Sequence, residues 1–176
     1  MKNNPFLETQ RLFIRPVRLH DFTELAAIWA DPKVMQFIDG SKTQAESKTQ
    51  LKHWIVDYEK QGYGFIALQC KSNGKIIGNS GFLRQVLDSK VYIELGYCLA
   101  QEYWGQGYAT EAVTALIHYG FSVLKFPELI AIIREENLAS LQVANKIGLR
   151  LLKIMAVDGQ RSKIFHILRG DYENSS

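Results

Sequence analysis

The chain has few cysteines and a small net charge, so it lacks the marks of disulfide-rich and of nucleic-acid-binding proteins. Its 176 residues include two cysteines, and 21 Lys and Arg nearly balance 18 Asp and Glu. Cys70 and Cys98 lie far apart, each in an apolar run, so they indicate buried thiols rather than a disulfide framework. A net charge of +3 is too small to indicate a nucleic-acid surface.

Long hydrophobic runs and metal-ligand motifs are also missing. No segment approaches the roughly 18 apolar residues of a membrane span, and the opening "MKNNPFLETQ" lacks the apolar centre of a signal peptide. We therefore expect a soluble, cytoplasmic protein with no membrane partner. The histidines show no metal-ligand spacing, so no metal is expected; they are His20, His53, His118 and His166.

The size and composition that are present predict one globular domain, residues 1–176. A chain of this length forms one sizeable core but is short for two. Its 47% hydrophobic and 22% charged residues are typical of an ordinary globular protein.

The first part of the chain predicts one strand and two helices. Residues 11–18, "RLFIRPVR", alternate like a strand, and Pro16 indicates an edge position or the strand end. His20 and Asp21 can cap a helix, which "DPK" then stops. A second helix is expected within residues 41–62, ending at Gly62.

The rest of the chain predicts a meander followed by alternating strands and helices. Strands are expected at 63–70, 75–84 and 90–100, with "KSNG" and "QVLDS" as turns. A helix near 108–124, a strand near 128–137, a helix at 138–148 and a hairpin turning at Asp158-Gly159 follow. The order predicts a mixed α/β sheet.

The stretch "EYWGQGYATEA", residues 102–112, places two glycines between a strand and a helix. Such a turn directs unpaired backbone N–H groups, and the positive end of the helix dipole, at one point. Gly105 and Gly107 permit positive φ and close approach of a phosphate, while Gln106, Tyr108, Ala109 and Thr110 supply amides. The stretch predicts an anion site; a tight turn without a ligand is the alternative.

Two common phosphate loops do not fit this stretch. A Walker loop needs Lys-Ser or Lys-Thr after its last glycine, and neither pair is present. A dinucleotide fingerprint needs a third glycine where Thr110 stands, and about 65 residues are too few for the βαβ units of that fold.

The stretch instead resembles the pyrophosphate loop of the GNAT superfamily of acetyl-CoA-dependent acetyltransferases. Its motif Gly-x-Gly-Tyr-Ala-Thr-Glu-Ala is similar to that of the ribosomal-protein-alanine N-acetyltransferase branch. "ETQRLFIRPVRLHDF", "IELGYCLA" and "ENLASLQVANKIGL" resemble further blocks of that branch, in the same order. The superfamily usually has Gln or Arg where this chain has Trp104.

The resemblance implies a mostly antiparallel central sheet flanked by about four helices, with acetyl-CoA bound where central strands splay. The implied pyrophosphate contacts are the amides of Gln106–Thr110. The residues expected to contact the coenzyme are Tyr97, Cys98, Leu99, Trp104, Gly105, Gln106, Gly107, Tyr108, Ala109, Thr110, Asn137 and Ser140. Backbone N–H groups between Gly96 and Leu99 are the expected donors to the thioester carbonyl.

Acetyl transfer also needs a base for the amine and a proton for the thiolate. Glu94 lies midway along an apolar strand, where a carboxylate is costly unless it is paired or faces a wet cleft. We expect Glu94 to be the general base, acting through water; an ion pair with Arg84 or Arg134 is the structural alternative.

The usual GNAT proton donor is a tyrosine four residues before a glycine, and here that place is Ala144. Ser140 is the expected replacement, as in the branch that the chain resembles, and Asn137 is expected to cap the helix and hold the pantetheine arm. The alternative makes both residues structural. Cys98 as an acetyl acceptor is a further alternative, disfavoured because no histidine is paired with it.

The sequence therefore predicts an N-acetyltransferase in which acetyl-CoA and a primary amine react directly. The acceptor is a protein N-terminus, a polyamine or another small amine, and the chain is a monomer or homodimer. One alternative is a non-catalytic domain that binds and senses coenzyme A. Another is a redox enzyme that binds a nicotinamide nucleotide.

Overall fold

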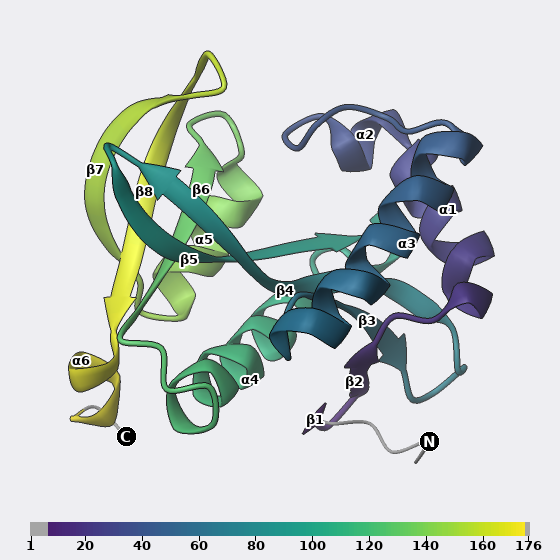
Figure 1. The fold of residues 1–176 in the computed structure, drawn as a ribbon, viewed down its shortest axis with the longest axis horizontal. Coiled ribbons are helices and arrows are strands. Elements are labelled where there is room, and N and C mark those ends of the chain that lie inside the picture. The colour runs from purple at the N-terminus through teal and green to yellow at the C-terminus, as the bar shows by residue number, and fades with distance from the viewer. Residues whose placement is uncertain (1–6, 175–176) are drawn as a thin grey trace. The chain divides into compact units, whose positions relative to one another are not determined.

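The computed structural model describes residues 7–174, and the chain divides into two compact units. The first unit contains the residues up to Gly81 and Tyr97–Ala112. The second contains Phe82–Gly96 and the residues from Val113 onward. Figure 1 labels the helices and strands of both units.

Antiparallel strands form the sheet of the first unit. In their order across the sheet they are β1 (Leu7–Glu8), β2 (Leu12–Pro16), β3 (Phe65–Cys70) and β4 (Ile76–Leu87), of which the part up to Gly81 belongs here. Leu12 pairs with Cys70 and Phe65 with Gly81. Pro16 is the last residue of β2, as predicted, because its ring leaves no N–H for a continuing ladder.

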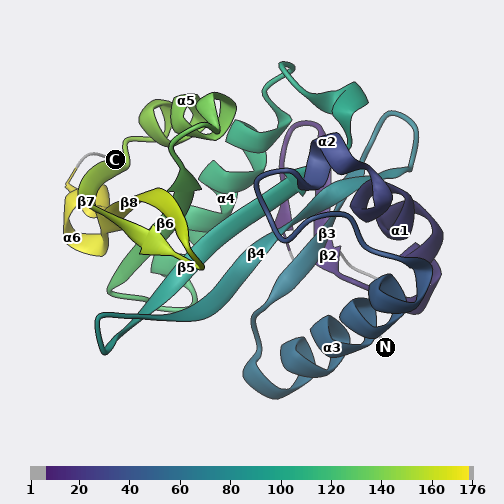
Figure 2. The same ribbon diagram turned by 90° about the horizontal axis from the view of Figure 1, so that it is seen from above.

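The helices of the first unit are α1 (Phe22–Ala30), α2 (Pro32–Met35) and α3 (Gln44–Gln61). α1 and α3 lie side by side in Figures 1 and 2. α3 begins with a capping box in which Thr43 and Glu46 bond reciprocally, and ends as predicted at Gly62, whose φ is +74°.

α1 ends at Ala30, so "DPK" stops it as predicted. The same residues also begin α2, which was not expected: Asp31 accepts a hydrogen bond from the amide of Lys33, and Pro32 lies in the first turn. One expectation for this region is wrong. His20 and Asp21 do not cap α1 with their side chains, because the Asp21 carboxylate is held by the Arg15 guanidinium, at 2.7 and 2.8 Å, and by the Arg18 amide.

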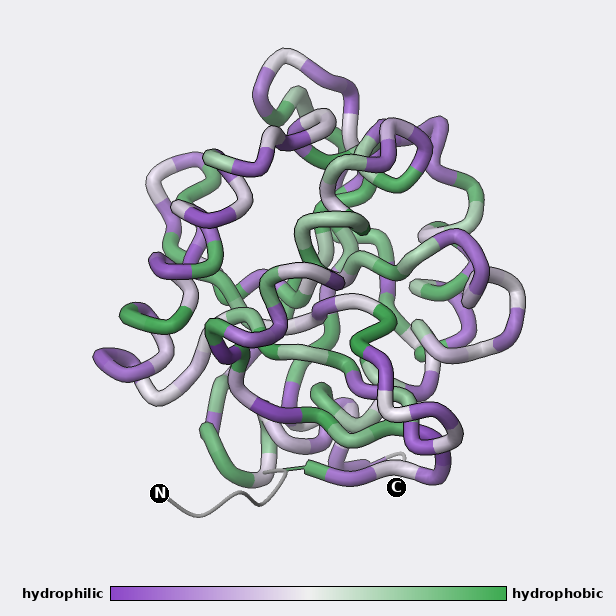
Figure 3. Tube along the Cα trace, turned by 90° about the vertical axis from the view of Figure 1, so that its right-hand side faces the viewer, coloured by the Kyte–Doolittle hydropathy of each residue, from purple (hydrophilic) through white to green (hydrophobic). Residues whose placement is uncertain are grey.

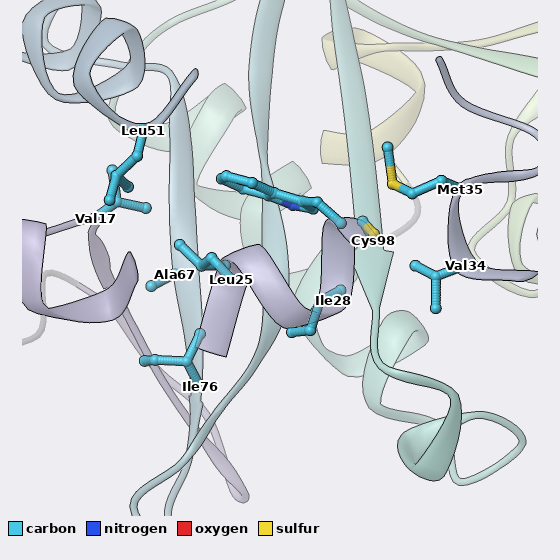
Figure 4. Packing of buried hydrophobic residues seen from close by; sticks show 10 residues of the cluster. Val17, Leu25, Ile28, Val34, Met35, Leu51, Ala67, Ile76 and Cys98 are labelled. Carbon is cyan, nitrogen blue, oxygen red and sulfur yellow. The ribbon is translucent and has the colours of Figure 1, made fainter. Parts of the chain in front are cut away.

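The core of the first unit lies between its helices and its strands. Figure 4 shows side chains of α1, α2 and α3 with those of the strands. The buried members of this cluster are Val17, Leu25, Ile28, Trp29, Val34, Met35, Leu51, Ala67, Ile76 and Cys98. The Trp54 ring stacks on Phe65 at 4.4 Å and meets Trp29 edge-on at 4.9 Å, so these aromatics belong to the core.

The second unit contains the rest of the sheet. Its strands are, in order across the sheet, the rest of β4, then β5 (Lys90–Leu99), of which the part up to Gly96 belongs here, β6 (Glu128–Arg134), β8 (Gln160–Leu168) and β7 (Arg150–Val157). β5 and β6 pair in parallel, with Glu94 beside Ile130, and β6, β8 and β7 pair antiparallel (Figure 1). Cys70 and Cys98, both in the first unit, are free and buried, as expected.

The turn between β4 and β5 is shorter than expected. "QVLDS" was predicted as a turn, but Gln85, Val86 and Leu87 continue β4. Only Asp88 and Ser89 turn, with φ of +48° and +64°. Two successive residues at positive φ make the tight turn that matches the twist of paired strands. The turn at Asp158-Gly159 between β7 and β8 is confirmed.

The helices of the second unit are α5 (Leu138–Lys146), α6 (Arg169–Glu173) and the part of α4 (Tyr108–Ser122) from Val113 onward. A small core joins β4, β5, β6 and β8; its buried members are Leu87, Tyr92, Ile130 and Ile164. Figure 3 shows hydrophobic and hydrophilic stretches alternating along the chain.

The predicted fold class is confirmed: a mixed, mostly antiparallel sheet with flanking helices. Eight strands and six α-helices lie in the described residues, and β1, α2 and α6 were not expected. No helix within residues 7–174 is long and apolar enough to span a membrane.

Candidate active site

The predicted strand, turn and helix are present around the two glycines. β5 ends at Leu99, a 3₁₀ turn covers Gln101–Tyr103, and α4 begins at Tyr108. Gly105 and Gly107 have φ of +70° and +83°, values that L-residues with side chains adopt at a cost. We call residues 104–110 the glycine loop.

The backbone amides of this loop form a continuous unpaired row. The Trp104 amide donates to the Gln101 carbonyl and the Glu111 amide to that of Gly107. The backbone amides of Gly105 to Thr110 lie between these two, and none of them donates to an acceptor in the described residues. At a helix N-terminus such amides suit an anion.

Side chains hold the glycine loop in place without a ligand. The Trp104 indole N–H donates to the Leu99 carbonyl at 2.8 Å, which ties the loop to the end of β5. The Gln106 side-chain amide donates to the Glu102 carbonyl at 2.6 Å. Before the loop, Asn73 donates to the Tyr103 hydroxyl at 3.1 Å. The loop is therefore preorganised, which reduces the entropic cost of binding.

Arg11 also binds this loop and is held by Glu111, and sequence reasoning assigned neither of them a role. Arg11 Nη1 donates to the Gln106 carbonyl at 2.8 Å, and Nε donates to Glu111 at 2.6 Å. The guanidinium lies 4.2 Å from the Tyr108 ring centroid. Glu111 further accepts bonds from the Thr9 hydroxyl and the Arg11 amide. Arg11 lies in "ETQRLFIRPVRLHDF" and Glu111 in "EYWGQGYATEA". They are 100 positions apart, so no local sequence pattern predicts that they pair.

The Glu111 carboxylate is charged at neutral pH. Burial raises its pKa, but the hydrogen bonds from Thr9 and Arg11, together with the Arg11 charge, outweigh burial and lower it. Nearby, the Tyr108 hydroxyl lies 3.7 Å from Cys70 Sγ, and this contact and burial raise the pKa of Tyr108.

Cys98 lies in the core of the first unit rather than at a reactive surface. Burial, with a smaller effect of Asp31, raises the pKa of its thiol to about 12. Its side chain lies with Met35 and Val34 in Figure 4. A thiol that stays protonated at neutral pH is a poor nucleophile, so this geometry disfavours Cys98 as an acetyl acceptor.

Glu94 lies in the β5 segment of the second unit and is half-buried. The Gln85 side-chain amide on β4 donates to its carboxylate at 2.8 Å. This partner is neutral. β5 buries side chains on both faces, with Tyr92 on the face of Glu94 and Leu95 on the other, so Glu94 interrupts an apolar strand.

Asn137 and Ser140 lie together at the start of α5. The Asn137 side-chain carbonyl accepts a hydrogen bond from the Ser140 amide at 3.1 Å, so the predicted cap is confirmed. Ser140 is half-buried. Ala144, one turn later, is 2% exposed and packs as a core residue.

The predicted site residues fall into two groups by unit. Those of the first unit are Tyr97, Cys98, Leu99 and the glycine loop; those of the second are Glu94, Asn137 and Ser140. Within residues 7–174, no group of three or more His, Cys, Asp or Glu could hold a metal ion.

The chain belongs to the acetyltransferase (GNAT) domain family, whose model matches residues 11–150. It is similar to the uncharacterized protein YkkB of Bacillus subtilis, with 34% identity over 153 residues that cover 84% of this chain and 86% of the relative. It is also 30% identical over 144 residues to an uncharacterized N-acetyltransferase, p20, of Bacillus licheniformis, covering 81% and 80%.

Solved structures share the fold. A GNAT-family acetyltransferase from Bacillus anthracis, 23% identical, has a TM-score of 0.80 over 93% of this chain and 98% of its own. A ribosomal L7/L12 alpha-N-protein acetyltransferase, solved with coenzyme A, is 18% identical and has a TM-score of 0.77 over 91% and 95%. The predicted GNAT family and the N-acetyltransferase class are therefore confirmed.

Proposed function

We propose that this N-acetyltransferase binds acetyl-CoA and a primary amine together and transfers the acetyl group directly between them. The observation that carries the proposal is the row of unpaired amides from Gly105 to Thr110 at the start of α4. A diphosphate bears several oxygens on adjacent phosphates, and successive amides can bond more than one of them.

The glycine loop fits this group. A Cβ built on Gly105 meets nothing within 4 Å, so its surroundings leave room for a ligand. In the proposed complex the amides of Gln106–Thr110 bind the diphosphate, and Trp104, a residue that is 44% exposed, borders it. The segment Tyr97–Leu99 receives the acyl end, where its amides remain the predicted donors to the thioester carbonyl.

The proposed reaction forms one C–N bond and breaks one C–S bond. The amine attacks the thioester carbon, and its proton passes through water to the Glu94 carboxylate. The coenzyme leaves as a thiolate and takes a proton from the Ser140 hydroxyl, and the proton held by Glu94 returns through water to restore that hydroxyl. Asn137 holds the pantetheine arm. No covalent acetyl-enzyme is needed, in agreement with the burial of Cys98.

Replacing Ser140 by alanine is expected to lower kcat by roughly 10- to 100-fold, because the thiolate then leaves without a protein proton donor. The affinity for coenzyme A should stay within about twofold, because the Asn137 side chain can still accept the hydrogen bond from the backbone amide at position 140. Steady-state kinetics and calorimetry measure the two quantities. Ser41→Ala, at an exposed position, is the matched control. An unchanged kcat would remove Ser140 from the chemistry.

The acceptor is best sought among protein N-termini, polyamines and other small amines. Likeness to a ribosomal L7/L12 alpha-N-protein acetyltransferase favours a protein N-terminus, and this argument rests on fold alone. The deciding experiment is a thiol-release screen with acetyl-CoA over peptides, polyamines and aminoglycosides. Coenzyme binding without release of thiol by any amine would favour the alternative, a domain that senses coenzyme A.

A further inference from the structure

We propose that Arg11 is a positioning residue for the coenzyme: it fixes the Gln106–Gly107 peptide so that the Gly107 amide faces the diphosphate. This inference rests on the proposed coenzyme site and adds a residue to it. Arg11 lies before β2, 95 positions from the peptide that it holds.

The orientation follows from the geometry of one peptide bond. Arg11 Nη1 donates to the Gln106 carbonyl at 2.8 Å, so that oxygen points toward Arg11. The described residues contain no cis peptide, and in a trans peptide the C=O and the following N–H point in opposite directions. The Gly107 N–H therefore points away from Arg11, and no acceptor in the described residues bonds it.

The same contact polarises the peptide. A charged donor on the carbonyl draws electron density from the amide, which makes the N–H on the other side a stronger donor. The Arg11 charge is itself paired with Glu111 at 2.6 Å, so the guanidinium acts through the peptide rather than as an unpaired cation for the phosphate.

The arginine cannot swing away from the loop. Its Nε and its own backbone amide both bond Glu111, and Thr9 bonds the same carboxylate at 2.6 Å. The Tyr108 ring lies against one face of the guanidinium. A Cβ built on Gly107 would lie 3.4 Å from Nη2, so Gly107 closely approaches the other part of the group. Two hydrogen bonds in different directions and one ring contact from a single planar group require arginine; a lysine satisfies one of them at a time.

The test compares Arg11→Met and Arg11→Lys with the unaltered chain. We expect the Kd for coenzyme A and the KM for acetyl-CoA to rise about 10-fold in both variants, the scale of one charge-assisted hydrogen bond, with kcat within about twofold. The salt dependence of the Kd should keep its slope, because the number of phosphate contacts from charged groups is unchanged. Lys52→Met, at an exposed position of α3, removes the same charge as a control.

The outcomes separate this inference from the function on which it rests. If the unaltered chain does not bind coenzyme A, both are overturned. If it binds and Arg11→Met binds equally well, or if the salt slope falls and so reveals a direct phosphate contact, the positioning role alone is overturned. Should circular dichroism show Arg11→Met unfolded, Glu111→Gln decides: it loosens the same guanidinium, and unchanged affinity there refutes the role.

Discussion

Replacing Gly107 by valine is expected to lower the affinity for coenzyme A by about 100-fold or more while the chain stays folded. At a φ of +83° a β-branched residue is strained, and its Cβ would lie 3.4 Å from Arg11 Nη2. The 106–107 peptide must then rotate, which turns its amide away from the proposed diphosphate position. Calorimetry with coenzyme A measures the affinity, and circular dichroism with a thermal melt measures the fold.

The matched control for this variant is Gly62→Val. Gly62 ends α3 at a φ of +74°, and a Cβ there meets nothing within 4 Å. It therefore carries similar backbone strain outside the glycine loop, and we expect a lower Tm with unaltered coenzyme affinity. Equal affinity of the Gly107→Val and unaltered chains would place the coenzyme elsewhere.

Replacing Glu94 by glutamine is expected to lower kcat/KM by roughly 10²- to 10³-fold at neutral pH, the usual contribution of a general base. The amide has nearly the same shape and can still accept the bond from Gln85, so folding should be preserved. Steady-state kinetics of both chains across the pH range measure kcat/KM.

Glu59→Gln controls for the loss of one negative charge, because Glu59 is an exposed residue of α3. Coenzyme affinity should be unaltered in both variants. If Glu94→Gln keeps its full kcat/KM across the pH range, the carboxylate is structural and the base lies elsewhere.

Elements with strong local signals were predicted well. The glycine loop and the start of α4 followed from a turn between an apolar strand and a helical pattern. α3 was predicted from its apolar spacing and from Gly62. In each case the determining residues are neighbours along the chain, so one sequence window contains the information.

Elements that depend on tertiary context were missed. Gln85–Leu87 resemble a loop by their polar neighbours, yet pairing extends β4 through them and leaves Asp88 and Ser89 to turn. Asp21 has the right place and chemistry for a cap, but the buried Arg15 guanidinium binds its carboxylate more favourably than an α1 amide would.

The candidate site divides in the same way. Unpaired amides could be inferred because a Gly-rich helix entrance exposes them whatever surrounds it. The Arg11–Glu111 pair joins residues 100 positions apart, and many other charged residues offered equally plausible partners from sequence alone. Side-chain contacts of that range are set by the fold.

The bond from the Trp104 indole to the Leu99 carbonyl gives the molecule a native optical reporter. Trp29 is 2% exposed and Trp54 is stacked in the core, whereas Trp104 meets solvent on the glycine loop. Its ring is held at a fixed place by one hydrogen bond, so its emission responds to a change of polarity at that place. Fluorescence at that ring can thus follow loop occupancy without a dye.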